Sequence, residues 1–345
     1  MTFSEHILKW YGQHKRDLPW RATSDPYKIW LSEIMLQQTR VAQGMPYYRK
    51  FLDAFPTVFE LAKAKEEQVL KLWQGLGYYS RARNLHATAK MVVESYAGQF
   101  PNTYKELKKL KGVGDYTASA IASICFDEPE PVVDGNVYRV LSRYFGIDIP
   151  INSTTGIKYF KEIAREVMHL GNIRDYNQGI MEFGAIQCAP KNPNCLHCPL
   201  NESCVALKEK RVTELPIKIN KTKIKNRYFN YLVFIDPDGN TVMDQRTGKG
   251  IWQNLYQFPL LESDKTLDLE GLKASLNLEN GWPRFKNVIL HNNKPIIHKL
   301  SHQHLHTQFW ILEIDQILDA GLLWNEITSF AVPVLIADFI KTFKI

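Results

Sequence analysis

The sequence has no long hydrophobic run and no targeting segment at its start. None of its 345 residues lies in an uninterrupted apolar stretch of the about 20 residues that a membrane-spanning helix needs. The opening residues, Met-Thr-Phe-Ser-Glu-His, contain neither the basic lead nor the apolar core of a secretory signal. We therefore expect an intracellular protein that works in the reducing conditions of the cytoplasm.

Cysteine is scarce, and its distribution argues against a disulfide scaffold. Four of the five cysteines are grouped with the spacing C-x6-C-x2-C-x5-C, as Cys188, Cys195, Cys198 and Cys204. In a reducing compartment such a group indicates a metal or a cluster. Structural zinc usually takes two close pairs of ligands, and only Cys195 and Cys198 form such a pair. A cubane iron-sulfur cluster with a structural role is therefore favoured, and zinc remains the alternative.

Acidic residues are fewer than basic ones, which gives a formal net charge of +7. With 45% hydrophobic and 23% charged residues, the chain has a globular rather than a disordered composition. Its length predicts two or three domains. The positive balance suits a polyanion such as nucleic acid, although many soluble proteins carry a similar excess. Basic residues are densest between positions 208 and 227, at Lys208, Lys210, Arg211, Lys218, Lys221, Lys223, Lys225 and Arg227. This basic stretch is either a solvated linker or a segment that follows a DNA backbone.

A β-strand pattern is absent from the first half of the chain. Apolar residues recur at helical spacing from position 25 to about 184, with a break near 146–155. The pattern changes after the basic stretch. Residues 228–235, the turn Asp-Pro-Asp-Gly and residues 240–245 predict a β-hairpin, and helices are expected near 265–277 and 333–343. The C-terminal third is therefore expected to be α+β.

A glycine-rich turn and an acid that follows it are the first candidates for function. Gly112 and Gly114 lie in Leu-Lys-Gly-Val-Gly-Asp-Tyr-Thr, just before an expected helix. Glycines permit backbone angles that other residues avoid, and the amides at a helix start can hold a phosphate. Asp134 precedes Gly135 and Asn136 at the start of another helix, where aspartate is also a favoured cap. The pair predicts a phosphate grip with a carboxylate beside it.

A second acid, Glu33, lies within the apolar helical segment Trp-Leu-Ser-Glu-Ile-Met-Leu. Glu33 and Leu36 are three residues apart and therefore share a helix face. Such a glutamate is usually half-exposed at the edge of a helix. In an apolar pocket, however, its pKa would rise and the carboxyl could act as an acid.

Together, the cysteine spacing, the glycine turn and the two acids resemble the helix-hairpin-helix DNA glycosylase superfamily with a four-iron, four-sulfur loop. Within it, the chain most resembles the adenine DNA glycosylase (MutY) family, closely over residues 1–205 and more loosely over 228–345. The resemblance implies a mostly α-helical N-terminal region with the iron-sulfur loop and an α+β, Nudix-like C-terminal domain. It predicts a cluster domain at 1–22 and 132–207, a helical domain with the hairpin at 23–131, a basic linker at 208–227 and a lesion-recognition domain at 228–345.

The resemblance also implies roles for single residues. Glu33 matches the acid that protonates adenine, and Asp134 matches the carboxylate that stabilises the positively charged sugar. Tyr116 stands where bifunctional relatives carry a lysine, and tyrosine cannot form the Schiff base of a lyase. The family usually has proline where this chain has Lys111. The chain should therefore be a glycosylase with little or no lyase activity.

The remaining site residues follow from the same resemblance. The adenine pocket is expected at Arg16, Trp20, Arg21, Leu36 and Gln178. Contacts with DNA or the lesion are expected at Gln38, placed around the same helix as Glu33, and at Tyr78, Gly112, Gly114, Asn136, Ser301 and His302. In the lesion-reading loop, Leu300 stands where relatives have phenylalanine. No array of glutamates suited to magnesium occurs between positions 261 and 282, so pyrophosphate hydrolysis is not expected.

We accordingly expect a monomeric, nucleoid-associated base-excision repair enzyme with a [4Fe-4S] cluster. Its expected substrate is adenine mispaired with 8-oxoguanine or guanine in double-stranded DNA. Two other classes are considered. A bifunctional endonuclease III-like pyrimidine glycosylase and lyase is disfavoured by Tyr116 and by the C-terminal domain, and a non-catalytic DNA-damage binding protein is disfavoured because both Glu33 and Asp134 are present.

Overall fold

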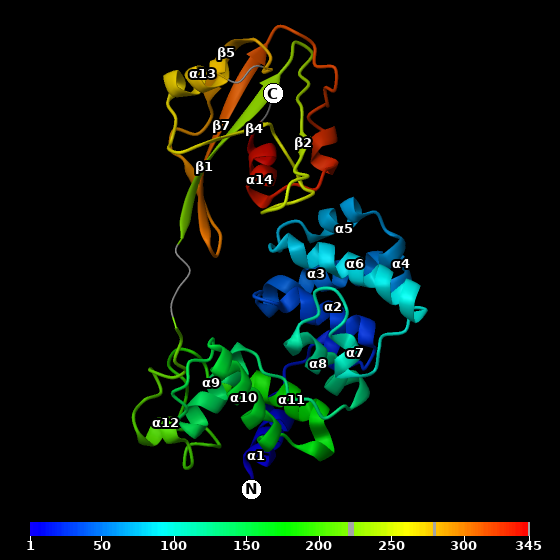
Figure 1. Ribbon diagram of the computed structural model, residues 1–345, viewed down its shortest axis with the longest axis vertical. Coiled ribbons are helices and arrows are strands. Elements are labelled where there is room, and N and C mark those ends of the chain that lie inside the picture. The colour runs from blue at the N-terminus through cyan, green and yellow to red at the C-terminus, as the bar shows by residue number, and fades with distance from the viewer. Residues whose placement is uncertain (220–223, 279–280, 344–345) are drawn as a thin grey trace. The chain divides into compact units, whose positions relative to one another are not determined.

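The computed structural model describes residues 1–219, 224–278 and 281–343, and its chain divides into two compact units (Figure 1). The first comprises Met1–Lys63 and Asn84–Asn220, and the second comprises Ala64–Arg83 and Lys221–Ile345. The short segment 64–83 therefore groups with the C-terminal part of the chain. Of the basic residues expected in the linker, Lys221 and Lys223 lie outside the described residues.

The first unit consists of helices, several of which begin at a side-chain cap. Thr2 accepts from the amide of Glu5 in a capping box at the start of α1, and Asp25 caps α2, whose first residue is Pro26. The helices are α1 (Phe3–His14), α2 (Pro26–Leu36), α3 (Val41–Ala54), α4 (Val58–Lys63), α6 (Tyr79–Tyr96, which begins in the second unit), α7 (Tyr104–Leu107), α8 (Asp115–Phe126), α9 (Gly135–Phe145), α10 (Thr154–Val167), α11 (Ile173–Glu182) and α12 (Val205–Lys208). Short 3-10 turns cover Pro19–Arg21 and Leu170–Asn172, and a π-helical turn covers Phe183–Gln187.

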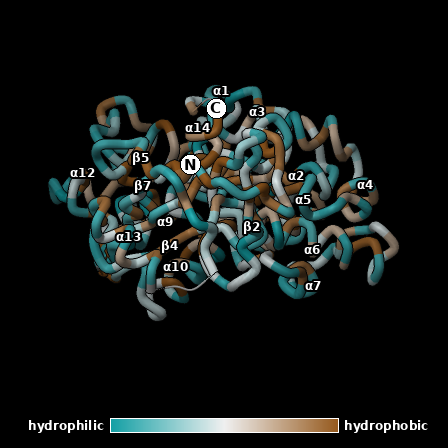
Figure 2. The backbone as a smooth tube through the Cα atoms, turned by 90° about the horizontal axis from the view of Figure 1, so that it is seen from above, coloured by the Kyte–Doolittle hydropathy of each residue, from teal (hydrophilic) through white to brown (hydrophobic). Residues whose placement is uncertain are grey.

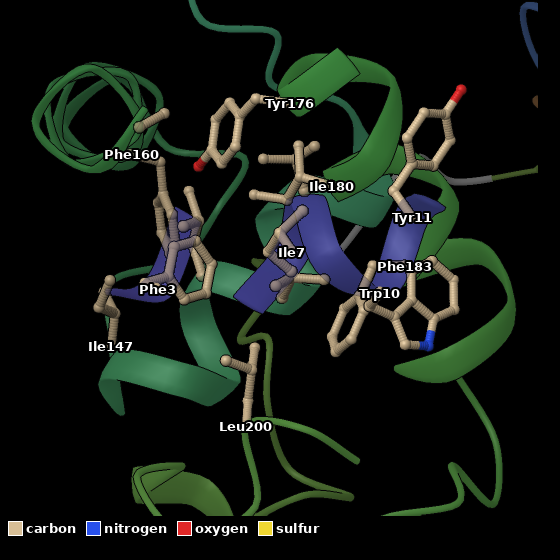
Figure 3. Packing of buried hydrophobic residues seen from close by; sticks show 14 of the residues in the cluster. Phe3, Ile7, Trp10, Tyr11, Ile147, Phe160, Tyr176, Ile180, Phe183 and Leu200 are labelled. Carbon is tan, nitrogen blue, oxygen red and sulfur yellow. The ribbon is translucent and has the colours of Figure 1, made fainter. Parts of the chain in front are cut away.

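One core of this unit surrounds α1 (Figure 3). Ile7 is fully buried in a cluster that also contains apolar residues of α9, α10 and α11, and Trp10 packs edge to face against Phe183 with 5.0 Å between ring centroids. Burial of large side chains of this kind stabilises a fold by about 1.5–3 kcal/mol per side chain. The chain start is thereby packed against helices that lie more than a hundred residues later.

The helix contacts bring the candidate segments together. α2 packs against α8, and α8 packs against α11. Glu33 lies on α2, Tyr116 on α8 and Gln178 on α11, so the three side chains come from adjoining helices.

The second unit contains a mixed sheet in the order β4-β1-β7-β5, with β6 also paired to β7. Its long central strands β1 (Lys225–Ile235) and β7 (Gln303–Ile314) are parallel, with Leu232 opposite Trp310. The other elements are α5 (Glu66–Trp73), β2 (Asp244–Gln245), β3 (Tyr256–Gln257), β4 (Leu260–Ser263), α13 (Leu269–Leu278), β5 (Phe285–Leu290), β6 (Ile296–Lys299), a 3-10 turn at Glu326–Ser329 and α14 (Val334–Thr342). The predicted fold class is confirmed: a helical first part precedes an α+β domain with a mixed sheet.

The predicted β-hairpin after β1 is wrong. The turn itself forms, because the Asp236 carboxylate accepts from the amides of Asp238 and Asn240. The residues beyond it do not return along β1, however. β2 pairs with β3, and Thr241 bridges to Leu322 instead. Both edges of β1 are already taken, by β4 and by the long apolar strand β7, so the local turn signal does not decide the pairing.

Hydrophobic and hydrophilic stretches alternate along the chain in both units (Figure 2). This alternation is what amphipathic helices and half-buried strands require. Within residues 1–219, 224–278 and 281–343, no helix combines the length and the apolar character needed to cross a membrane.

Candidate active site

Glu33 lies in the interior of the first unit, on the buried face of α2. Its side chain is only 8% exposed, and the Tyr116 hydroxyl donates a 2.6 Å hydrogen bond to its Oε2. Burial raises the pKa of Glu33 to about 7, because a charged carboxylate is poorly solvated there, and the bond from Tyr116 only partly opposes the rise. A carboxyl with this pKa exists in both protonation states near neutral pH and can therefore deliver a proton.

Asp134 caps the start of α9 and is held by three donors. Its Oδ1 accepts from the amides of Asn136 at 2.9 Å and Val137 at 2.8 Å, and its Oδ2 accepts from the Asn136 side-chain amide at 2.7 Å. Burial raises the pKa of Asp134 above its usual value, while these hydrogen bonds lower it and so favour the anion. The capping role inferred from the sequence is therefore real, and it fixes the direction of the carboxylate.

Glu33 and Asp134 line one cavity of about 500 Å³. Tyr116 lines it as well, and its hydroxyl lies 3.4 Å from the Met181 sulfur in addition to its bond with Glu33. The negative charge of Asp134 contributes to the raised pKa of Glu33, after the larger effect of burial. One carboxyl that can hold a proton near neutral pH and a second carboxyl fixed by three hydrogen-bond donors suit the two roles that glycosidic cleavage requires.

The glycine turn forms the rim of the same cavity. Gly112 has φ +76°, and a Cβ there would lie 2.7 Å from the Cβ of Asn84, so both backbone angle and space require glycine. Gly114 is the N-cap of α8 and supplies no side chain to its first amides. Those amides are left available for an anion such as a phosphate. The turn is anchored through Lys111, whose carbonyl accepts from the Thr88 hydroxyl at 2.5 Å.

Glu33 also lines a smaller cavity of about 50 Å³, whose lining contains three of the five expected adenine-pocket residues. The seven side chains that line it are Trp20, Arg21, Ile29, Glu33, Ile124, Gln178 and Met181. A volume of this size holds a few water molecules at most and not a purine. A flipped base would therefore need the side chains around Trp20 to move apart.

The other two expected pocket residues have different positions. Leu36 is half-buried and faces the larger cavity with Glu33 and Asp134. Arg16 lines a separate groove beside Tyr11 and Arg21 rather than the small cavity.

Glu182, at the end of α11, is the residue that sequence reasoning missed. Its carboxylate is 1% exposed and accepts from two guanidinium groups, with Arg16 Nη2 at 2.5 Å and Arg21 Nη2 at 2.7 Å from its Oε2. Its Oε1 accepts from Arg16 Nε and Arg21 Nη1 as well. Burial alone would raise the pKa of Glu182, but the bonds from Arg16 and Arg21 lower it to about 2. The spacing of four between Gln178 and Glu182 placed both on one helix face and could have revealed this group.

Glu182→Gln should weaken the clamp, the pair of ion pairs that Glu182 forms with Arg16 and Arg21. The free energy of unfolding at neutral pH should fall by roughly 2 kcal/mol, which is less than the loss expected for a fully buried ion pair because Arg16 is partly exposed. Since the folded-state pKa of Glu182 is depressed, its stabilising effect exists above the unfolded value near 4.5 and is lost as pH falls towards 2. The difference between variant and parent in urea unfolding should therefore shrink with acidification. Glu166→Gln, an exposed carboxylate on α10, is the control. Equal differences at pH 7 and pH 3 would contradict the assignment.

Gln38 does not lie on the helix that carries Glu33, which corrects the sequence-based placement. α2 ends at Leu36, where the Thr39 amide bonds the Leu36 carbonyl, and Gln38 is an exposed turn residue with φ +56°. A left-handed angle at a non-glycine residue is uncommon. Gln38 still lines the cavity that holds Glu33 and Asp134.

A further cavity, of about 570 Å³, lies within the second unit. Tyr78 contributes to its wall; the residue is 44% exposed and has φ +51°. Ser301 and His302 also line it, on the turn between β6 and β7, with Ser301 Oγ 3.2 Å from His302 Nδ1. The remaining lining is largely apolar and includes Trp252 and Leu300. An exposed aromatic ring beside apolar walls and two hydrogen-bonding side chains suits a planar base.

The four grouped cysteines lie beside the core around α1. Cys188 and Cys198 pack against it, and Arg143 donates to the Cys188 sulfur at 3.4 Å. The pKa of Cys198 is raised to about 11, mainly by burial, and the nearness of Cys188, Cys204 and Cys195 contributes to the rise. Across residues 1–219, 224–278 and 281–343, no three His, Cys, Asp or Glu side chains are arranged to hold a metal ion. The four thiols nevertheless lie near enough to affect one another's pKa, and a guanidinium donates to one of the sulfurs. Both features fit four thiolates that hold one shared cluster.

Two sequence models of protein families match the chain. The family described as "HhH-GPD superfamily base excision DNA repair protein" matches residues 31–166, which include Glu33, the glycine turn and Asp134. The family described as "NUDIX domain" matches residues 230–342.

Curated relatives match nearly the whole chain. An adenine DNA glycosylase of Buchnera aphidicola subsp. Schizaphis graminum is 37% identical over 314 residues, which cover 88% of this chain and 86% of that protein. The mouse adenine DNA glycosylase is 31% identical and covers 99% of this chain and 78% of that protein. A solved structure of a thermostable thymine-DNA glycosylase is 33% identical, with a TM-score of 0.56, and covers 60% of this chain and 95% of its own. A trapped endonuclease III–DNA intermediate, 21% identical with a TM-score of 0.53 over 60% of this chain and 94% of its own, shares the fold.

Proposed function

The chain belongs to the adenine DNA glycosylase family, and we propose that it hydrolyses the bond between adenine and deoxyribose where adenine is mispaired with 8-oxoguanine or guanine in duplex DNA. The observation that carries this proposal is the common cavity of Glu33 and Asp134. Duplex DNA must present the adenine outside the base stack for these groups to reach it.

In the proposed reaction, Glu33 protonates the adenine ring and makes it a better leaving group. Its pKa of about 7 supports this role, because a useful fraction is protonated at neutral pH. As the bond to adenine breaks, positive charge develops on the sugar, and the Asp134 carboxylate stabilises it. Water then adds to the sugar carbon and loses a proton to the Glu33 carboxylate, which restores the acid and completes hydrolysis.

Tyr116 supports a monofunctional reaction. Its hydroxyl donates to Glu33 at 2.6 Å and so orients the acid. A phenol has no amine with which to form a Schiff base on the sugar. Release of adenine should therefore leave an intact strand with an abasic site.

DNA binding is assigned to groups around the cavity that contains Glu33 and Asp134 and to groups in the second unit. The amides that follow Gly112 and Gly114 bind a backbone phosphate, and Gln38 and Asn136 contact the DNA beside it. Tyr78 stacks on a base, and Ser301 and His302 hydrogen-bond the oxidised guanine. The aromatic ring and the polar pair in one cavity of the second unit support the last assignments.

Arg16, Trp20, Arg21, Leu36 and Gln178 are proposed to surround the extruded adenine. The clamp of Arg16 and Arg21 by Glu182 supports a pocket whose guanidinium groups are fixed before the base arrives. Gln178 is also held, because its side-chain oxygen accepts from the Tyr11 hydroxyl at 3.3 Å. Such fixed groups reduce the entropy lost on binding.

We further propose that the cysteines hold a [4Fe-4S] cluster within a domain formed by residues 1–22 and 132–207. The proposed organisation also includes a helical domain at 23–131, a basic linker at 208–227 and a lesion-recognition domain at 228–345. The protein is proposed to act as a monomer. The cluster's contribution is structural, through the four thiolates Cys188, Cys195, Cys198 and Cys204. Metal analysis should find about four irons per chain, whereas about one zinc would support the alternative.

The test of function is single-turnover cleavage of a duplex with one adenine opposite 8-oxoguanine. A second duplex carries an oxidised pyrimidine. The proposal expects adenine release from the first duplex and strand breaks only after alkali. Cleavage of the pyrimidine duplex with immediate strand breaks would instead favour a bifunctional enzyme, and tight binding without release would favour a damage-binding protein.

A further inference from the structure

Asp115 is a third carboxylate on the wall of the cavity that contains Glu33 and Asp134. It is the first residue of α8, directly after Gly114, and its side chain is 50% exposed. A negative charge at this place favours the helix start. It also lies beside the amides that are proposed to hold a phosphate, where it would repel that phosphate unless a cation offsets it.

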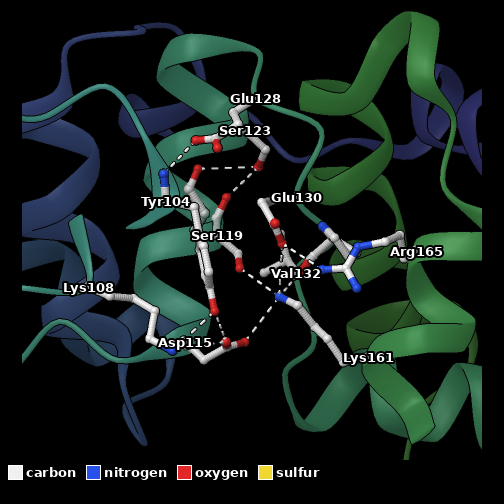
Figure 4. Close-up of polar contacts among 12 residues, drawn as sticks. Tyr104, Lys108, Asp115, Ser119, Ser123, Glu128, Glu130, Val132, Lys161 and Arg165 are labelled. Carbon is white, nitrogen blue, oxygen red and sulfur yellow. Dashed lines mark hydrogen bonds and ion pairs between the residues drawn. The ribbon is translucent and has the colours of Figure 1, made fainter. Parts of the chain in front are cut away.

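Lys161 of α10 provides that cation (Figure 4). Its ammonium lies 3.1 Å from Asp115 Oδ2 and its side chain is only 15% exposed. Tyr104 donates its hydroxyl to the other carboxylate oxygen, and Lys108 lies 3.8 Å from that oxygen. Asp115 is therefore held by two cations and a phenol rather than left free in the cavity.

Two further hydrogen bonds of Lys161 extend beyond the ion pair. The ammonium donates to Ser119 Oγ on α8 and to the carbonyl of Pro131, both at 2.8 Å. Pro131 lies three residues before Asp134, in the segment that leads to α9. One ammonium thus bonds the start of α8 and the segment that carries the second acid.

The segment before Asp134 has other supports, so Lys161 is one of several. The Asn177 amide donates to the Glu130 carbonyl at 2.9 Å and its oxygen accepts from the Val132 amide at 3.2 Å. The Glu130 carboxylate lies 3.3 Å from Arg165 and 3.6 Å from Lys161. Loss of Lys161 should therefore displace the segment slightly and not unfold it.

We propose that Lys161 is a positioning residue with two separable effects: it offsets the charge of Asp115 beside the phosphate-binding turn, and it holds the Pro131 carbonyl so that Asp134 stays aimed at the sugar. This inference rests on the proposed function. The first effect acts on DNA affinity, through charge. The second acts on the chemical step, through the position of Asp134.

The two effects predict a split between binding and cleavage. Lys161→Met should weaken binding of a duplex with 8-oxoguanine opposite 2′-fluoroadenosine, whose glycosidic bond resists cleavage, by about 5-fold. Asp115→Asn should tighten binding by about 2- to 5-fold. The double variant should bind about as well as the parent. Its single-turnover cleavage of the natural adenine duplex should remain about as slow as that of Lys161→Met.

Lys158→Met is the matched control, because Lys158 is on the same helix, its side chain is 82% exposed, and its ammonium lies 3.9 Å from Glu162, its one ion-pair partner among the residues that the structure describes. It removes the same charge and should change neither binding nor cleavage by more than about 2-fold. Cleavage by Lys161→Met that equals cleavage by Lys158→Met would overturn the proposal. So would a double variant that binds as weakly as Lys161→Met, or an Asp115→Asn variant that binds no more tightly than the parent.

The comparison of Asp115→Asn with the parent does not depend on whether Lys161→Met folds, because Asp115→Asn keeps every lysine. The parent protein separates this inference from the function on which it rests. A parent that releases no adenine would refute the function, whereas an active parent with unchanged variants would refute only the role of Lys161.

Discussion

Replacing Glu33 with glutamine is expected to slow adenine release by about 10³-fold in single-turnover assays. Glutamine has nearly the same shape and can still accept the hydrogen bond from Tyr116, but it has no proton to deliver to the base. DNA affinity should change little, because Glu33 is 8% exposed and contributes little charge at the surface. Glu94→Gln, an exposed carboxylate on α6, should cleave like the parent.

The pH dependence of the parent provides a second signature of Glu33. Its pKa is raised to about 7, and the protonated form is the active acid. The rate should therefore be highest below pH 7 and fall by up to about tenfold per pH unit above it, until another step limits the reaction. Glu33→Gln should lose this dependence. A variant that keeps more than about a tenth of the parent rate, or a parent rate that rises between pH 7 and 9, would exclude Glu33 as the acid.

The Glu33→Gln variant, although inactive, should be more stable than the parent at alkaline pH. The folded-state pKa of Glu33 is raised above the unfolded value of 4.5, so its contribution to stability is fully present below that value and is lost as pH rises through about 7. At pH 8 the buried charge costs on the order of 3 kcal/mol. Glu33→Gln removes this cost and should melt at a higher temperature than the parent at pH 8, with no such gain at pH 4.

Asp134→Asn is the second substitution with a large expected effect, a loss of about 10²- to 10³-fold in the rate of adenine release. Asparagine is as good a helix cap as aspartate, so α9 should start as before and the melting temperature should change little. What is lost is the negative charge that faces the cationic sugar. Adenine release is measured under single-turnover conditions, with circular dichroism to follow unfolding.

Asp134→Ala is the informative companion to this variant. Alanine cannot accept from the amides of Asn136 and Val137, so it should cost about 1 kcal/mol of stability in addition to the lost rate. A purely structural role of Asp134 predicts that activity follows stability. In that case Asp134→Asn would be active and Asp134→Ala would not, which would refute charge stabilisation.

Several features were predictable because the signal lies within a short stretch. The start of α8 at Asp115 follows from Gly112 and Gly114, and the cap of α9 follows from Asp134. The change from helical spacing to strands after the basic stretch was predicted correctly, because the periods of helices and strands differ over ten residues. The end of α2 was not foreseen, since no glycine or proline marks the turn at Gln38.

Pairing between distant segments required the structure. The sequence predicted a turn after β1. Whether β2 or β7 pairs with β1 depends on how the long apolar strand β7 packs, and the local sequence does not specify this. The clamp on Glu182 likewise depends on a contact between the chain start and α11. The cost of closing such loops is similar for many alternatives, so local preference does not select among them.

By itself, the sequence determined the chemistry available to this protein: two acids in different settings, a tyrosine in place of an amine nucleophile, a turn that only glycine can form and four grouped thiols. Tertiary structure alone decided that Glu33 and Asp134 share a cavity, that burial raises the pKa of Glu33 to about 7 and that Lys161 reaches both Asp115 and Pro131. The reason is physical. Residue type fixes what a group can do, but solvent exclusion and the distance between charges exist only once the helices pack.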